Sequence, residues 1–298
     1  MVRSAVALLL AFFLMLIVIM LGSESLLLIQ RIAQASGVQG EAQYRAKGES
    51  QWAPLAGGTL VRAGSQVRTG ADASATFTWS DGTKVKVGPN SRLTVEKCYA
   101  KSGSDEEVSL FRLEQGCVWT RIAKKLGRQG RFEVATPSAV AGVRGTIFSV
   151  EARQADAHGG AVISVFEGEV ELRTSKGKRV VPGGSVAVVA GPGEVEVRLQ
   201  QAQEIGRWLA SEDIVLPSLR VTAPRNGEKV GSDSVWVSGW AEPGSSVTVN
   251  GVPADPRPSG DFRSVCRLRP GSNAIEVVAK DHASRCRTAA LAVVSAAP

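Results

Sequence analysis

The stretch ATFTWSDGTKVKV, residues 75–87, decides the fold class of this chain. Apolar and polar residues alternate on both sides of Asp81-Gly82. A period of two is typical of a strand with one buried face, and Asp-Gly is a frequent two-residue hairpin turn. The stretch therefore predicts an antiparallel hairpin that packs one face on a hydrophobic core.

The same alternation recurs on both sides of this hairpin, throughout residues 37–197. Glycine-bearing turns separate the short apolar runs, and the whole chain has 32 glycines. Short strands joined by such turns predict an all-β region. The clearest further runs are Phe132–Val134, Ile147–Val150, Val162–Phe166, Val170–Leu172 and Val186–Val189.

The sequence of this region resembles the FecR domain, which is named for envelope signalling proteins of iron uptake. The residues that carry the resemblance are Gly37–Gly40, Leu60–Gly70, Asp81–Thr83, Pro89–Leu93, Gly116–Val118, Thr136–Thr146, Phe148 and Phe166–Val170. The runs TPSAVAGVRGT at 136–146 and FEGEV at 166–170 are the most specific of these. The resemblance implies an all-β domain of the β-roll or solenoid type over residues 36–198.

Arg144, Gly145 and Thr146 lie in the most specific of these motifs. Gly142 and Gly145 allow the backbone to approach closely around Arg144, and a planar guanidinium can bridge turn carbonyls or bind a carboxylate. We expect Arg144 to be a buried structural staple of the fold. Contact with a ligand is the alternative.

The run AVALLLAFFLMLIVIMLG, Ala5–Gly22, is uncharged and about long enough to cross a bilayer as a helix. Ala33-Gln34-Ala35 forms a small-x-small site, so a cleaved secretory signal is the competing interpretation. The apolar cluster Leu26–Ile29 lies between the run and that site, which favours a retained anchor. In both interpretations, residues 1–35 export the rest of the chain to the periplasm or the cell surface.

FecR proteins of iron uptake carry a cytoplasmic anti-sigma domain before their membrane helix. Here about four residues precede the apolar run, so we expect no such domain. A signal would then pass inward only through a separate membrane partner.

A connector is expected at residues 199–216. Leu199, Ala202, Ile205 and Leu209 recur every three or four residues, which predicts a short amphipathic helix. Because one short helix is weak evidence for a partner site, we expect it to pack against its neighbours.

Residues 217–298 return to short strands with regularly spaced turns, which predicts a β-sandwich. The phrases VTVNG at 247–251 and GDF at 260–262 are similar to immunoglobulin-like modules of bacterial envelope and carbohydrate-active proteins. The resemblance implies a second, immunoglobulin-like domain.

The four cysteines form two well-separated pairs, Cys98 with Cys117 and Cys266 with Cys286. Neither pair has the close spacing of a zinc or redox motif. Each pair falls inside one expected domain, and export would place it in an oxidising compartment. We therefore expect two disulfides; buried free thiols are the alternative.

The net charge of +7 does not by itself indicate nucleic acid, because the cations are interleaved with acids and lack the interspersed aromatics of a nucleic-acid groove. No nucleophile elbow or phosphate-binding loop is present, and neither His158 nor His282 has metal-ligand neighbours. We expect no catalytic residue, no metal and no cofactor.

These observations favour a non-catalytic binding or scaffolding protein of the bacterial cell envelope, anchored by one helix. Its expected partners are the membrane and an envelope glycan, peptidoglycan or another envelope protein. The alternative is a FecR-type sensing component that signals through a separate membrane partner.

Overall fold

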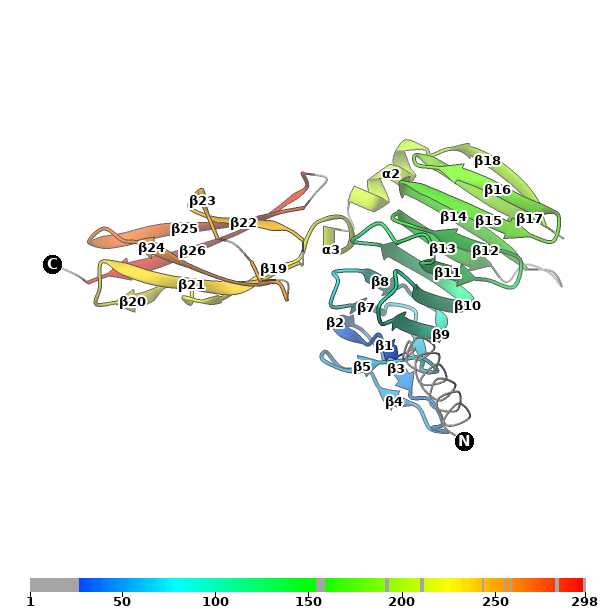
Figure 1. Ribbon diagram of the computed structural model, residues 1–298, viewed down its shortest axis with the longest axis horizontal. Helices are drawn as coiled ribbons and strands as arrows, with labels where there is room; N and C mark the ends of the chain where they lie inside the picture. Colours follow the sequence, from blue (N-terminus) through cyan, green and yellow to red (C-terminus); the bar gives the residue numbers. More distant parts are fainter. Residues whose placement is uncertain are drawn as a thin grey trace, which may run out of the picture.

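The computed structural model describes residues 27–153, 159–190, 193–209, 212–242, 244–254, 256–257, 259–281 and 284–296. These residues form two β-rich units joined by a short helical connector (Figure 1). The larger unit contains β1 to β18, and the smaller one contains β19 to β26. The described part of the chain is nearly all β, which agrees with the predicted all-β fold class.

The larger unit is built from eighteen strands whose hydrogen bonds close into a barrel. Their bounds are β1 Leu28–Gln30, β2 Ala33–Gln39, β3 Ala42–Arg45, β4 Ala53–Pro54, β5 Leu60–Val61, β6 Gln66–Thr69, β7 Ser74–Thr78, β8 Lys84–Val87, β9 Arg92–Lys101, β10 Glu107–Arg121, β11 Arg131–Ala135, β12 Val140–Val143, β13 Ile147–Arg153, β14 Gly160–Glu167, β15 Glu169–Thr174, β16 Gly177–Pro182, β17 Ser185–Ala190 and β18 Glu194–Leu199. Successive hairpins from β11 onward alternate between two sheets, as in a β-roll.

The long strand β10 belongs to both sheets. Its first half pairs with β9 and runs parallel to β11, and its second half pairs with β8 and β13. The first sheet therefore has the order β16-β15-β12-β11-β10-β9-β6-β3-β4, with β1 also on β9. The second has the order β18-β17-β14-β13-β10-β8-β7-β2-β5.

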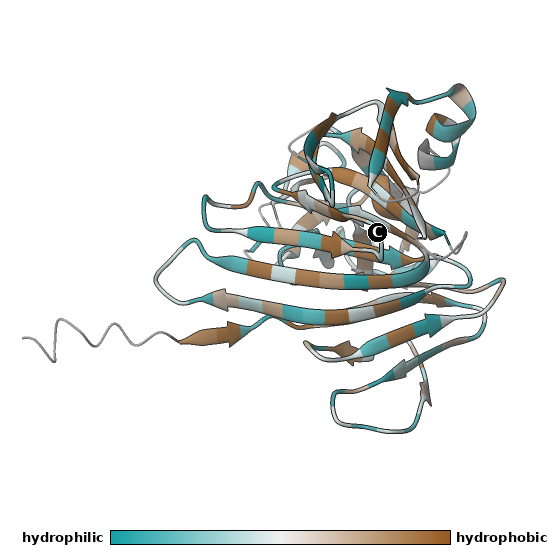
Figure 2. Cartoon of the chain, turned by 90° about the vertical axis from the view of Figure 1, so that its right-hand side faces the viewer, coloured by the Kyte–Doolittle hydropathy of each residue, from teal (hydrophilic) through white to brown (hydrophobic). Residues whose placement is uncertain are grey.

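The hairpin predicted at residues 75–87 is confirmed as β7 and β8. Ala75 pairs with Val87 and Phe77 with Val85, and all four side chains are buried. Figure 2 shows the alternation of polar and apolar residues along the strands. The buried set faces the core between the two sheets.

Aromatic rings form the centre of this core. The Phe111 ring lies 5.8 Å from Trp79 and 5.1 Å from Phe132, and the Phe132 ring lies 6.3 Å from Phe148. These separations are in the favourable range for edge-to-face and tilted pairs. Strands β10, β11 and β13 are thereby packed on one another across the barrel.

The smaller unit is a β-sandwich, as predicted. A three-stranded sheet has the order β19-β21-β24, and a five-stranded sheet has the order β20-β26-β25-β22-β23. Their shared core contains Val237, Phe262, Ile275, Val277 and Val293. The strands are β19 Leu219–Ala223, β20 Glu228–Val230, β21 Ser234–Ala241, β22 Ser246–Val249, β23 Val252–Pro253, β24 Asp261–Arg267, β25 Gly271–Lys280 and β26 Cys286–Ser295.

The connector contains two short helices, α2 Ala202–Leu209 and α3 Glu212–Val215, instead of the single helix predicted. Ile205 of α2 is 39% exposed, so the expected apolar stripe is not buried there. The packing is made by Ile214 and Val215 of α3, which are buried in a cluster with Ile147. The chain after α2 therefore holds the connector to the larger unit.

The expected anchor, Ala5–Gly22, lies outside the described residues. Within the described part of the chain, no helix is long and apolar enough to cross a membrane. Ala33 and Ala35, which flank the candidate cleavage position, are buried in strand β2. That strand pairs with β5 and β7, so the candidate signal-peptidase site is part of the folded core.

The structure does not support either expected disulfide, because all four cysteines are free. Cys98 pairs with Ser109 of β10, and Cys117 lies eight residues further along that strand. Eight residues of strand span roughly 25 Å, whereas disulfides need Cα atoms within about 7 Å.

The other expected pair is divided between the two sheets of the sandwich. Cys266 is buried in β24, where its sulfur lies 3.4 Å from the Asn250 side-chain nitrogen. Cys286 is exposed at the start of β26, in register with Lys280. The two cysteines of each expected pair therefore lie at separate places in the fold, which their spacing in the sequence does not indicate.

The free thiols give a direct test of this correction. Burial, followed by the nearby Glu151 charge, raises the pKa of Cys117 to about 11. Burial also raises the pKa values of Cys98 and Cys266, so thiolate is scarce at these three positions near pH 8. A colorimetric thiol reagent should titrate four thiols in non-reducing guanidinium and only the exposed Cys286 rapidly in the native protein. Zero thiols in guanidinium would restore the disulfide prediction.

Candidate functional site

The motif residue Arg144 follows strand β12 and is exposed, not buried as expected. Its backbone carbonyl accepts a hydrogen bond from Leu126 N at 2.7 Å. Its side-chain Nη2 donates to the carbonyl oxygen of Arg128 at 3.3 Å. The backbone of Arg144 thus holds the loop after β10, while its guanidinium lies at the surface.

The structural role expected of Arg144 falls instead to Thr146, which is 2% exposed. Its Oγ1 donates to the Glu169 carbonyl at 3.0 Å, and its own carbonyl accepts from Ile122 N at 3.2 Å. Gly145 lies between Arg144 and Thr146. Its carbonyl oxygen is so close to Gly168 that a Cβ atom added at residue 168 would lie 2.7 Å from it. The two motifs singled out in the sequence, at 136–146 and 166–170, therefore meet at this turn.

A groove of about 600 Å³ lies beside Arg144 on the outer face of the first sheet. We call it the Arg144 groove. Its lining includes Phe132, Gly142 and Val143 of β11 and β12. Its cationic lining residues are Arg128, Arg131, Arg144, Arg173 and Lys178, and its acidic ones are Glu133, Glu169 and Glu171.

Three of these cations are neutralised within the groove. Glu133 accepts from Arg131 at 3.0 Å and from Arg173 at 2.7 Å, and Lys178 lies 3.4 Å from Glu171. Burial opposes ionisation of Glu133, but its hydrogen bonds from Arg173 and Arg131 outweigh that effect and lower its pKa. The carboxylate therefore stays charged and keeps both arginines engaged.

Arg128 and Arg144 differ from these neighbours. In the described ranges, neither guanidinium forms an ion pair with a carboxylate. A guanidinium presents a planar fork of donors that matches a carboxylate or phosphate. The groove can therefore receive an acidic group from another molecule.

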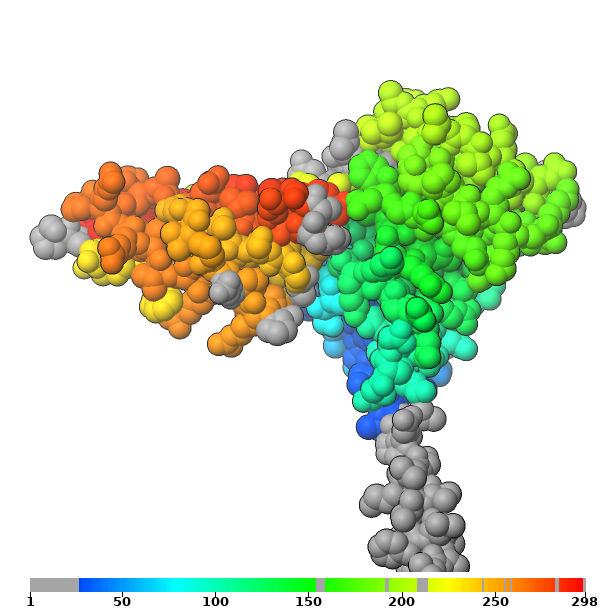
Figure 3. All heavy atoms as spheres, turned by 45° about the horizontal axis from the view of Figure 1, so that its top comes forward, coloured from blue at the N-terminus to red at the C-terminus, as the bar shows by residue number. Residues whose placement is uncertain are grey.

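The two units lie against each other (Figure 3). A second polar centre is buried at this junction. Arg121, the last residue of β10, contacts Glu242 at 2.7 Å and Asp281 at 3.0 Å through its two terminal nitrogens. Lys84 lies 3.3 Å from Glu242 and donates to the Leu216 carbonyl at 3.2 Å. These four charged side chains, which we call the junction cluster, are each at most 3% exposed.

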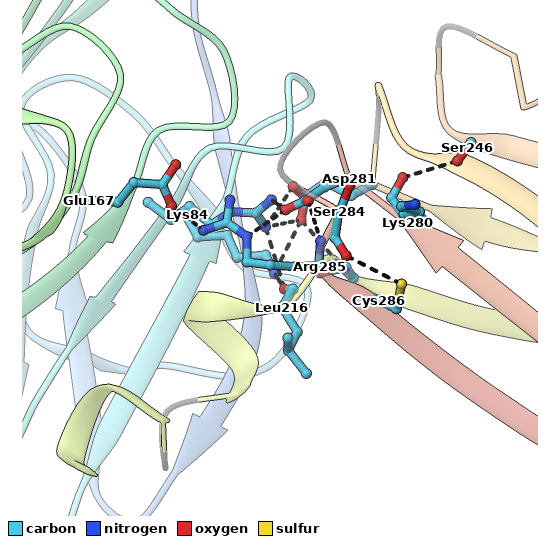
Figure 4. A network of polar contacts seen from close by, with 12 residues as sticks. Lys84, Glu167, Leu216, Ser246, Lys280, Asp281, Ser284, Arg285 and Cys286 are labelled. Atoms are coloured by element: carbon cyan, nitrogen blue, oxygen red, sulfur yellow. Dashed lines mark hydrogen bonds and ion pairs between the residues drawn. The ribbon is translucent and has the colours of Figure 1, made fainter. Parts of the chain in front are cut away.

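The rim of the junction cluster joins the same two units. Arg285 contacts Asp281 at 2.8 Å and reaches Glu167 of β14 at 2.6 Å (Figure 4). A pocket of about 820 Å³ adjoins the cluster, lined also by Lys124, Lys125 and Ser245. Because its buried charges already satisfy one another, we assign the junction cluster to holding the units together.

Neither site resembles a metal centre. No group of three or more His, Cys, Asp or Glu residues suited to a metal occurs among residues that the structure describes. His158 and His282 lie outside the described residues.

Residues 65–171 match the family model described as FecR protein. The larger unit is a FecR domain. Residues 217–296 match the model described as glucodextranase, domain B, which fits the predicted immunoglobulin-like sandwich. The match at 65–171 contains both the Arg144 motif and the FEGEV run, so the resemblance read from the sequence is confirmed.

Solved structures of low similarity accompany these matches. A proposed anti-sigma factor from Parabacteroides distasonis is 22% identical, with a TM-score of 0.40, over 49% of this chain and 65% of that one. Fibronectin(III)-like modules of Clostridium thermocellum CbhA are 11% identical, with a TM-score of 0.23, over 62% of this chain and 88% of that one. The FecR-domain chain thus spans about 65% of the length of the first of these proteins. No curated protein matches it.

The junction cluster gives a stability prediction. Burial opposes ionisation of Asp281, but hydrogen bonds from the Arg285 side chain and backbone, with the charges of Arg285 and Arg121, hold its pKa below the usual 3.8. Asp281→Asn should lower the free energy of unfolding by about 3 kcal/mol at pH 7, because it leaves the Arg121 charge undercompensated. The measurement is urea unfolding of the full chain.

The effect should depend on pH with a defined sign. The folded pKa of Asp281 is depressed, so its stabilisation is present above pH 3.8 and is lost as the pH falls through the folded pKa. The difference between Asp281→Asn and wild type should therefore shrink in that range. Glu96→Gln, which breaks the exposed pair with Arg112, is the control and should cost less than about 1 kcal/mol. An Asp281 effect no larger than this control would contradict the assignment.

Proposed function

We propose that this FecR-domain protein is a non-catalytic binding and scaffolding protein of the bacterial cell envelope. The Arg144 groove is where it contacts its partner. The observation that carries the proposal is the pair of arginines, Arg128 and Arg144, that share this groove without a carboxylate partner in the described part of the chain. Arg144 lies in the most specific motif of the domain, which supports a role in binding.

The groove favours a partner that carries carboxylates. Arg144 is already oriented by its bond to the Arg128 carbonyl, so less side-chain entropy is lost when it binds. The neighbouring pairs with Glu133 keep the rest of the lining close to neutral, which limits non-specific attraction. Peptidoglycan stem peptides and acidic protein segments of the envelope both present such groups.

Retention at the membrane is the second part of the proposal. Cleavage after Ala35 would remove Ala33 and Ala35, both buried in the core, and Arg31. Arg31 forms an ion pair with Asp81 of the β7–β8 turn and donates to Ser109 at 3.1 Å. Since the folded domain uses these residues, an uncleaved N-terminal anchor accounts for them better than a removed signal does.

The anchor is tested by mass spectrometry of the native N-terminus after membrane fractionation. The expected result is a membrane-bound chain whose N-terminal peptide lies before residue 27. Ser36 as the first residue of the mature chain would refute retention but would leave the binding role intact.

The binding role is tested with the full-length protein and purified murein sacculi, together with cross-linking in cells to capture envelope proteins. The double variant Arg128→Ala/Arg144→Ala should weaken capture at least tenfold, because two charge-assisted contacts are lost. Arg92→Ala/Arg112→Ala is the matched control, since these exposed arginines of the same sheet pair with Glu114 and Glu96.

Two outcomes would count against this function. Equal capture by both double variants would remove the Arg144 groove from it. An absence of any captured polymer or protein, with altered transcription of a defined regulon on deletion, would favour the sensing role that the FecR match also supports.

A further inference from the structure

The outer face of the three-stranded sheet of the sandwich carries an exposed apolar pair. Trp236 of β21 is 51% exposed and Val265 of β24 is 48% exposed. The two residues are in register across the sheet, on the face opposite buried Val237 and Cys266. A tryptophan exposed to this extent in the middle of a strand makes no contribution to the core that would account for it.

Arginines surround this pair. Arg263 and Arg267 alternate with Val265 along β24, so all three point to the same face, and Arg220 of β19 lies opposite Trp240 on that face. The guanidinium carbon of Arg263 lies 3.9 Å from the centre of the Trp236 ring. Stacking on the ring holds the Arg263 fork in one orientation while its donors stay exposed.

These arginines lack acidic partners. In the described part of the sandwich, Arg220, Arg263 and Arg267 form no ion pair with a carboxylate. Asp261 is the acidic residue at the end of the same face, and it accepts a hydrogen bond from the Ser259 hydroxyl at 2.8 Å. We call this surface, from Trp236 and Val265 to the three arginines, the tryptophan face.

We propose that the tryptophan face binds an acidic polysaccharide made of carboxylated pyranose units. A pyranose ring has an apolar C–H face that can pack on the part of the Trp236 indole that Arg263 leaves exposed, and its carboxylate suits the oriented Arg263 fork and Arg267. The proposal rests on the envelope-binding function above. It adds a second site, in the other domain, with its own ligand chemistry.

Charge and geometry distinguish this ligand from other occupants. A second copy of the chain, related by a twofold axis, would bring arginines against arginines at the face. Single-stranded nucleic acid is bound by successive exposed aromatic residues, whereas this face has one largely exposed ring. An acidic sugar polymer meets both requirements of the face, because each unit carries an apolar surface and a negative charge.

The test measures binding of the full-length protein to polygalacturonate oligosaccharides, with neutral dextran oligosaccharides of equal length as the comparison. Trp236→Ala and Arg267→Ala should each weaken polygalacturonate binding at least tenfold, and Trp236→Phe should restore much of the loss. Dextran should bind weakly, and polygalacturonate affinity should fall as salt is added. Val252→Ala is the control, since Val252 is 58% exposed on β23 of the other sheet.

The outcomes separate this site from the Arg144 groove. Polygalacturonate binding that survives Arg128→Ala/Arg144→Ala and is lost in Trp236→Ala supports the tryptophan face. Binding lost only in the groove variant would overturn this inference and leave the proposed function standing. The inference would also be overturned by no polygalacturonate binding, or by tighter Trp236-dependent binding to single-stranded DNA or anionic vesicles.

Discussion

The arrangement of the two domains depends on the burial of Arg121. A guanidinium that is 1% exposed is strongly unfavourable unless anions meet it, and both of its carboxylate partners, Glu242 and Asp281, come from the other domain. Lys84 is a second buried cation and lies beside Glu242. Separating the domains would allow all four groups to regain water, so the closed arrangement is maintained by the fit of the junction cluster and not by charge alone.

An apolar junction of the same size would slide more easily. Hydrophobic contacts are non-directional, whereas the Arg121 fork can donate to both of its carboxylates only in one relative orientation. Strand β10 transmits this constraint inward, because the strand that ends at Arg121 also places Phe111 in the aromatic core and belongs to both sheets. The orientation of the sandwich is thereby tied to the centre of the FecR domain. The Arg144 groove and the tryptophan face are consequently linked through the junction cluster.

The local sequence pattern was enough to predict the strands. It was not enough to predict the burial of individual side chains or the long-range register of the strands. The hairpin at residues 75–87 was found because its alternation and its turn are close in sequence. Arg144 was misplaced because glycines on both sides show where a backbone can approach, but not whether the side chain between them faces the core or the solvent. The disulfide prediction was wrong because sequence separation does not determine strand register. Cys98 lies opposite Ser109, far along β10 from Cys117. The junction cluster joins Arg121 to residues 121 and 160 positions away, and no local signal predicts such contacts.

The same distinction changes what the net charge of +7 means. Composition counts every cation equally, but many cations are paired with carboxylates of this chain, among them Arg131, Arg173 and Arg285. Such paired cations attract a partner only weakly. The attraction that remains comes from arginines without such partners, and two groups of them lie on separate domains. Because the junction cluster holds the two domains together, a long acidic polymer that binds one group would reach the other at high effective concentration. A modest affinity at each surface then suffices for firm attachment, which is what the proposed scaffolding role requires.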